Sequence, residues 1–268
     1  MMLVNSQAGD TISVHDRGLH FGDGVFETIA IRHGKLSLLW ERHMARLYGG
    51  CERLGISAPR KTLLLDEAKR VCGSMDDGVL KIIITRGAAG RGYRAPVAAE
   101  PTRILISYPW PDYPASNREQ GIIVRRCVTQ LGHRPTLAGI KHLNRLEQVL
   151  ARSEWHNDDI AEGLMLDDHG NVIEGTMTNL FVVQDGRLVT PDVSQCGIAG
   201  VMREHIIDVA WQHGAACHIT TLSPADVKQA DEVFVCNSLV GIWPVRRFEE
   251  IRYSDWPMTG KIIRWLAT

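Results

Sequence analysis

Strand-like segments joined by tight turns dominate the second half of this 268-residue chain. Two short apolar runs, Leu180–Val183 and Leu188–Thr190, flank the dipeptide Asp185-Gly186, which is a strong signal for a β-hairpin. A second turn signal, Asp168-His-Gly-Asn171, precedes this hairpin. Strands and helices interleave along the chain, but hairpins this frequent do not fit a doubly wound parallel sheet. We therefore predict α+β architecture.

Two prolines mark a break between the halves of the chain. Trp110-Pro-Asp-Tyr-Pro114 interrupts the apolar pattern, and polar residues follow as far as Gln120. We predict an N-terminal α+β domain over residues 1–112, a linker over 113–120, and a larger C-terminal domain over 121–268 that is rich in antiparallel strands.

Apolar periodicity and capping residues predict the individual elements. Helices are expected over 37–55, with Ser37 and Gly55 as caps, over 142–156, over Val201–His213, from Ser223-Pro224, and at the C-terminal end. Strands are expected at Val79–Thr85, Arg103–Tyr108, Ile122–Val128 and Glu232–Cys236.

Charge and composition exclude several classes of protein. Thirty basic and thirty-one acidic residues give a net charge of −1, which does not favour nucleic-acid or membrane-surface binding. No apolar run approaches the ~18 residues of a membrane helix, and the N-terminus does not read as a signal peptide. The six cysteines form no C-x-x-C pair, and the histidines show no ligand spacing. We expect a cytoplasmic protein without a metal site or disulfides.

Generic catalytic motifs identify no reaction. The chain has no H-E-x-x-H, no G-x-S-x-G and no complete P-loop, and Gly22-Asp-Gly24 supplies only two glycines of a dinucleotide fingerprint.

One segment is more informative. Lys141 lies between Gly139-Ile140 and an amphipathic run in Ala138-Gly-Ile-Lys-His-Leu-Asn-Arg-Leu-Glu-Gln-Val149. Taken alone, Lys141 would be interpreted as a solvated surface charge. However, this run resembles the cofactor-lysine segment of fold-type IV pyridoxal-phosphate enzymes, and among these it is most similar to the aminodeoxychorismate lyases. Four further motifs occur in the family's order: Phe21–Phe26, Arg86–Tyr93, Ile173–Phe181 and Gly197–Arg203.

The resemblance implies a two-domain fold-type IV structure that binds pyridoxal 5'-phosphate. Lys141 would hold the cofactor as a Schiff base and later take a proton from the substrate. Glu174 would face the pyridine nitrogen and keep the ring protonated, which makes the ring a better electron sink. The phosphate would be bound by Arg46, by the backbone N–H groups of Ile198 and Ala199 ahead of a helix, and by Asn237 and Ser238.

The resemblance also implies a small-molecule substrate, 4-amino-4-deoxychorismate, and the products 4-aminobenzoate, a folate precursor, and pyruvate. Arg91 in the glycine-rich loop would bind a substrate carboxylate bidentately, and Tyr93 would line the same pocket. Thr28 would relay a proton near the reacting carbon; the alternative is an ordinary β-branched strand residue. An RNA-binding interpretation of the Arg-Gly-rich loop is disfavoured, because the loop occurs once, between two buried strands.

Two other functions remain open. A fold-type IV aminotransferase acting on D-amino or branched-chain amino acids would use the same Lys141 and Glu174 and would require a keto-acid acceptor. A non-catalytic protein that kept the fold is disfavoured by the complete set of lysine, glutamate and arginine. The family analogy further implies a homodimer.

Overall fold

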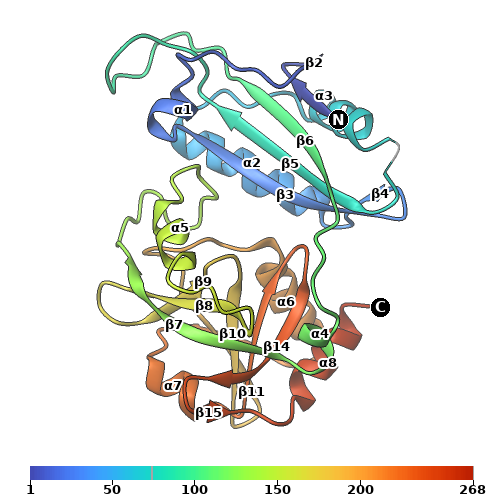
Figure 1. The fold of residues 1–268 in the computed structure, drawn as a ribbon, viewed down its shortest axis with the longest axis vertical. Coiled ribbons are helices and arrows are strands. Elements are labelled where there is room, and N and C mark those ends of the chain that lie inside the picture. Colours follow the sequence, from blue (N-terminus) through green and yellow to red (C-terminus); the bar gives the residue numbers. More distant parts are fainter. Residues whose placement is uncertain (74, 268) are drawn as a thin grey trace. The chain divides into compact units, whose positions relative to one another are not determined.

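The computed structural model describes residues 1–73 and 75–267, which form two compact units (Figure 1). The first unit comprises Met1–Asp112 together with Ile140–Asn144. The second comprises Tyr113–Gly139 and Arg145–Thr268. The expected linker, 113–120, begins the second unit and contains the short helix α4 (Ser116–Glu119).

The first unit is an antiparallel sheet with helices packed against one face. Its strand order is β2-β1-β6-β5-β3-β4. The strands are β1 (Met2–Val4), β2 (Gln7–Ala8), β3 (Gly24–Arg32), β4 (Lys35–Leu36), β5 (Gly78–Thr85) and β6 (Arg103–Pro109). The helices are α1 (Arg17–Phe21), α2 (Trp40–Leu54) and α3 (Lys61–Cys72), and α2 runs alongside β3 (Figure 1).

Successive side chains of β3 point alternately into a buried core and toward a less buried face. Val25, Ile29 and Ile31 are buried in a core that also contains Met44 and Leu47 of α2. Residues of the opposite phase, Phe26 and Thr28, are only half-buried. Because successive strand residues point to opposite faces, one face of β3 builds the core and the other remains available for a ligand.

The second unit is built on a mixed sheet with the order β12-β11-β10-β13-β14-β7-β8-β9. Since β9 also pairs with β10, the strands from β10 through β13, β14, β7 and β8 to β9 close into a ring. The strands are β7 (Ile122–Leu131), β8 (Ile160–Asp167), β9 (Val172–Gly175), β10 (Asn179–Gln184), β11 (Arg187–Pro191), β12 (Cys217–Thr220), β13 (Glu232–Asn237), β14 (Gly241–Phe248) and β15 (Ile251–Arg252). The β7–β8, β14–β7 and β11–β12 pairs are parallel.

Helices of the second unit cover parts of this sheet. They are α5 (Leu146–Arg152), α6 (Val201–Gln212), α7 (Pro224–Gln229) and α8 (Pro257–Trp265). Helices α6 and α8 pack on β13 over a core that includes Phe181, Phe234 and Ile262. No helix within residues 1–73 and 75–267 is both long and apolar enough to cross a bilayer.

Most of the predicted elements are present. The hairpin turn places Asp185 at φ 50° and Gly186 at φ 73°, as a two-residue primed turn requires. Ser223 forms a capping box with Asp226, and Pro224 occupies the first turn of α7. The helix predicted over 37–55 begins at Trp40, and Gly55 ends it in the left-handed conformation. The prediction of Ser37 as its cap is wrong: Leu39 is the N-cap residue, and the Ser37 hydroxyl accepts from the Leu39 N–H ahead of the helix.

The helix predicted over 142–156 is shorter than expected, because α5 spans only Leu146–Arg152. The residues before it are extended along β3: the Phe26 N–H donates to the Lys141 carbonyl (2.9 Å), and the Leu143 N–H donates to the Gly24 carbonyl (3.0 Å). These long-range hydrogen bonds override a local helical pattern.

Candidate active site

Lys141 is fixed to the first unit by its backbone. His142 forms an antiparallel bridge with Val25, and Ile140 is buried in the core of this unit. The Lys141 ammonium lies 4.5 Å from the centroid of the Phe26 ring, within the range of a cation–π contact. The segment therefore holds the amine over the face of β3 that points away from α2.

Two further polar side chains belong to the same face. Thr28 follows Phe26 by two residues and so projects from the same side of β3. Lys81 on β5 is directly opposite Thr28, and its ammonium lies 5.4 Å from the Phe26 centroid. Phe26 is thus contacted by two cations, Lys141 and Lys81, close to a hydroxyl.

A buried ion-pair cluster lies on the opposite face of β3. Glu27 is fully buried and accepts hydrogen bonds from Arg46 Nε and Nη2, both at 2.7 Å. His43 Nδ1 lies 2.7 Å from the same carboxylate. Burial alone would raise the pKa of Glu27, but Arg46 and His43 outweigh it and lower the pKa to about 2. Arg46, predicted as a phosphate ligand, is therefore held in a fixed orientation by Glu27.

Arg17 of α1 anchors the glycine-rich loop between β5 and β6. Arg17 donates from Nη1 and Nη2 to the carbonyls of Gly92 (2.9 Å) and Tyr93 (3.0 Å). Arg17 Nε also pairs with Asp23 at 2.8 Å, and Arg86 binds the same carboxylate. Burial would raise the pKa of Asp23, but hydrogen bonds from Arg86 and Arg17 outweigh it and lower the pKa.

The tip of this loop is open to solvent. Arg91 and Tyr93 are exposed, Tyr93 to 87%, although its ring lies 5.4 Å from that of Phe21. At the base, Gly87 has φ 90°, and a Cβ there would lie 1.8 Å from the Glu100 carbonyl oxygen. Only glycine fits where the backbone passes this close to Glu100, so Gly87 fixes where the loop begins.

Glu174 lies on β9 in the second unit and is almost completely buried, with 3% exposure. Its Oε2 accepts a hydrogen bond from the Ile198 N–H at 2.8 Å. The Ala199 N–H donates to the Gly139 carbonyl at 3.3 Å, and Gly139 and Ile198 form a parallel bridge. Both backbone N–H groups predicted to bind phosphate therefore have protein partners in this structure. To bind an anion, they would have to give up these hydrogen bonds.

The start of α6 offers further donors beside these two. Gly200 occupies the N-cap position, and no side chain caps the helix. The N-terminus of a twelve-residue helix attracts anions, because its first N–H groups lack helical partners and the helix dipole is positive there. Asn179 Nδ2 donates to the Ile198 carbonyl at 2.9 Å and so anchors the loop that leads into α6.

Glu162 on β8 organises the turn that follows Glu174. It is fully buried and accepts hydrogen bonds from the hydroxyls of Thr176 (2.6 Å) and Thr178 (2.9 Å) and from the Thr176 N–H (3.0 Å). An added Cβ on Gly175 would lie 2.8 Å from this carboxylate. Glu162 thus fixes the backbone immediately after Glu174.

The remaining phosphate candidates lie at the end of β13. Asn237 Oδ1 accepts from the N–H groups of Leu239 (2.8 Å) and Val240 (2.9 Å), and its Nδ2 donates to the Met177 carbonyl (3.2 Å). These bonds give Asn237 a structural part in the turn. Ser238 is half-buried next to it.

The structure thus assigns the predicted residues to two groups. Lys141, Thr28, Arg46, Arg91 and Tyr93 belong to the first unit, and Glu174, Ile198, Ala199, Asn237 and Ser238 belong to the second. Sequence reasoning missed Lys81, Glu27, His43 and Glu162. A usable signal existed for Glu27: it is a charged residue in the buried phase of β3, between Val25 and Ile29, and such a residue requires a partner.

Comparisons with known proteins identify the family of the chain. The sequence profile described as "Amino-transferase class IV" matches residues 24–248. The chain is 35% identical to an aminodeoxychorismate lyase of Vibrio harveyi, over 99% of this chain and 98% of that protein. It is 34% identical to a putative branched-chain-amino-acid aminotransferase of Methanocaldococcus jannaschii, over 87% and 81%. The crystal structure of 4-amino-4-deoxychorismate lyase from Pseudomonas aeruginosa superimposes with a TM-score of 0.94 at 48% identity, over 99% and 98%. The chain therefore belongs to the amino-transferase class IV family.

Proposed function

We propose that this protein is a pyridoxal-phosphate-dependent lyase that converts 4-amino-4-deoxychorismate to 4-aminobenzoate and pyruvate. The observation that carries the proposal is the position of Lys141: its ammonium lies 4.5 Å from the Phe26 ring, on the strand face that carries Thr28. The 48% identity to a structurally matching lyase supports the same activity.

The residues present fit the cofactor chemically. Pyridoxal phosphate requires an amine for its aldehyde, a carboxylate for its pyridine nitrogen and donors for its phosphate. Lys141 would supply the amine, buried Glu174 the carboxylate, and the N-terminus of α6, which no side chain caps, an anion site. When bound, the cofactor withdraws electrons from the substrate carbon that carries nitrogen.

The side chains divide the remaining tasks. Lys141 would hold the cofactor and would accept the proton from the substrate carbon that carries nitrogen. Glu174 would face the pyridine nitrogen and favour its protonated form. Thr28, on the Lys141 face of β3, relays a proton as pyruvate departs. Arg91 and Lys81 supply positive charge for the two substrate carboxylates, Arg91 from the loop and Lys81 from β5.

The decisive assay supplies enzymatically made aminodeoxychorismate and measures 4-aminobenzoate and pyruvate. The wild-type protein should form both products in equal amounts without a keto-acid acceptor, and Lys141→Ala should form neither. The wild-type protein should be yellow and lose its colour with borohydride, whereas Lys141→Ala should not retain cofactor covalently. A requirement for a keto acid would instead favour the aminotransferase, and a protein that stays colourless with added cofactor would refute both enzymes.

Thr28 has its own test. Thr28→Ala should slow pyruvate release by about 100-fold, since positioned proton transfer contributes about 10²–10⁴-fold. Cofactor absorbance should be unchanged, and Thr28→Ser should restore most of the rate. Unchanged turnover in Thr28→Ala would remove this residue from the mechanism.

We also propose that the protein is a cytoplasmic homodimer. Leu146, Val149 and Leu150 lie at i, i+3 and i+4 on α5 and are 74%, 57% and 60% exposed, which makes an apolar helix face suited to a second copy. Light scattering should give a dimer for the wild-type protein and a shift toward monomer for Leu150→Glu. A wild-type monomer would refute the dimer. The free cysteines of the described chain agree with a reducing compartment.

A further inference from the structure

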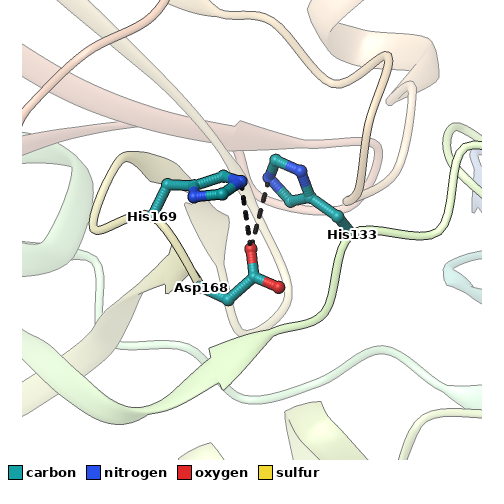
Figure 2. A group of neighbouring side chains, drawn as sticks. All are labelled: His133, Asp168 and His169. Carbon is teal, nitrogen blue, oxygen red and sulfur yellow. Dashed lines mark ion pairs between the residues drawn. The ribbon is translucent and has the colours of Figure 1, made fainter.

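Two histidines and an aspartate converge at one end of the ring-shaped sheet of the second unit. His133 follows the end of β7, and Asp168 and His169 lie in the turn between β8 and β9. Figure 2 shows both imidazole rings directed at a single carboxylate oxygen. Asp168 Oδ1 lies 3.6 Å from His133 Nε2 and 3.8 Å from His169 Nε2.

The turn that carries Asp168 and His169 is held firmly. Asp167, which is buried, accepts from the N–H groups of His169 (3.0 Å) and Asn171 (2.7 Å) and from Asn171 Nδ2 (2.9 Å). Asp167 Oδ2 also lies 2.9 Å from His133 Nε2, so it connects this turn to the segment after β7. The rings of His133 and His169 meet edge to face with centroids 4.5 Å apart. The backbone of the turn and the His133 ring are thus held in place before any ion binds.

We propose that His133 Nε2, Asp168 Oδ1 and His169 Nε2 bind a divalent transition-metal ion of the Zn²⁺ class. The three ligand atoms lie within 4.8 Å of one another. Metal–ligand bonds of about 2.0–2.1 Å in a tetrahedral site separate neighbouring ligand atoms by about 3.4 Å. The 3.6 Å and 3.8 Å separations from Asp168 Oδ1 are close to this value, and the two imidazole nitrogens lie within 4.8 Å of each other. On binding an ion, His133 Nε2 would exchange its contact with Asp167 Oδ2 for the metal.

The donor set selects the type of ion. Two imidazoles and one carboxylate suit Zn²⁺, Co²⁺, Ni²⁺ and Cu²⁺, whereas Mg²⁺ and Ca²⁺ prefer sites made of oxygen ligands. The side chains of His169 and Asp168 are 67% and 49% exposed, so the ion would keep open positions for water. None of the three ligands is among the residues assigned to the lyase reaction.

Neighbouring side chains offer two other ligand sets for a metal ion. Cys196 lies close to His133 and Asp167, but Asp167 is buried and already accepts hydrogen bonds from the N–H groups of His169 and Asn171, which makes it a poorer ligand than Asp168. A simple histidine–aspartate ion-pair cluster without metal affinity is the other possibility. A third group, His33 with Asp76 and Asp77 in the first unit, is exposed and offers one imidazole, which makes it a suitable control.

Calorimetric titration of the pyridoxal-phosphate-loaded full chain with Zn²⁺ tests the proposal, with Mg²⁺ as the control ion. We expect one saturable Zn²⁺ site per chain and no response to Mg²⁺. His169→Ala and Asp168→Asn should each weaken Zn²⁺ binding by at least about tenfold, because loss of an interaction in the coordination shells has effects of this size. His33→Ala should bind as the wild-type protein does.

A second measurement separates ligation from loss of structure. Co²⁺ bound to the wild-type protein should give visible d–d absorption that disappears in His169→Ala, while the metal-free thermal midpoints of the two proteins agree. Absence of saturable Zn²⁺ binding would overturn the proposal and leave the ion-pair cluster. Equal Zn²⁺ affinity in His169→Ala and the wild-type protein, or loss of binding in His33→Ala instead, would also overturn it.

Discussion

Glu27→Gln would disrupt the buried cluster on the core face of β3. The substitution keeps the size of the side chain but removes its charge. It also places an amide NH₂, which is a donor, where Arg46 and His43 meet two carboxylate oxygens. The Arg46 side chain is only 12% exposed, so its guanidinium would lose its counter-charge in a largely dry environment.

Two independent routes give the size of the effect. Removing one partner of a buried ion pair costs about 3–5 kcal/mol. The fall in the pKa of Glu27 from 4.5 to about 2 corresponds to about 3 kcal/mol of folding free energy. Because the folded-state pKa lies below the unfolded value, this stabilisation is complete above pH 4.5 and is lost as the pH falls through about 2.

Hydrogen exchange during urea titration measures the loss in the first unit alone, since two units need not unfold together. Peptides from β3 and α2 should show a loss of about 3 kcal/mol in Glu27→Gln, constant from pH 8 to pH 5 and shrinking below pH 4.5. Glu52→Gln is the matched control, because Glu52 is exposed on α2, the helix that carries Arg46 and His43, and it should change stability by less than about 0.5 kcal/mol. A loss below about 1 kcal/mol in Glu27→Gln, or equal losses in both variants, would refute the reasoning.

Three further outcomes are expected. Gly87→Ala should lower stability by more than about 1 kcal/mol and raise the KM for aminodeoxychorismate, because φ is 90° at Gly87 and a Cβ would meet the Glu100 carbonyl oxygen. The control Gly90→Ala should change neither the thermal midpoint nor the KM, because open space surrounds Gly90. Glu162→Gln should destabilise the second unit by about 1–3 kcal/mol in urea unfolding, since it places an amide NH₂ donor where the carboxylate now accepts from the hydroxyls of Thr176 and Thr178. A thiol reagent at pH 8 should label the native protein slowly, at Cys217 first, and should label all six cysteines rapidly in urea, because five are buried and burial raises the pKa of the thiols. Fast labelling of several cysteines in the native protein would contradict the buried positions.

Local chemistry accounts for the elements that the sequence predicts well. The Asp185-Gly186 hairpin and the Ser223 capping box depend on residues within a few positions of each other, so their signals are contained in short windows. The start of α5 depends instead on hydrogen bonds between residues 141–143 and β3, more than a hundred residues away. No pattern within residues 142–156 could reveal that pairing.

The candidate site divides in the same way. Family resemblance predicts Lys141 and Glu174 as cofactor residues, because those motifs are read along the chain. Lys81 was missed because its closeness to Thr28 comes from strand register, and the two residues are 53 positions apart. His43 and Arg46 lie three residues apart on α2 and so share a helix side, but their common partner Glu27 emerges only when α2 packs on β3.

Strand β3 should tolerate substitutions on one of its faces, both in evolution and in design. Its pairing with β5 runs without a register shift from Gly24 to Ile31, so an insertion or deletion there would exchange inward and outward side chains along the strand. Even-numbered positions such as Phe26 and Thr28 can be exchanged one at a time while Val25 and Ile29 keep the interior packed. Mutant libraries that vary only these positions should retain folded protein while sampling new chemistry, whereas shifts in strand length should yield none.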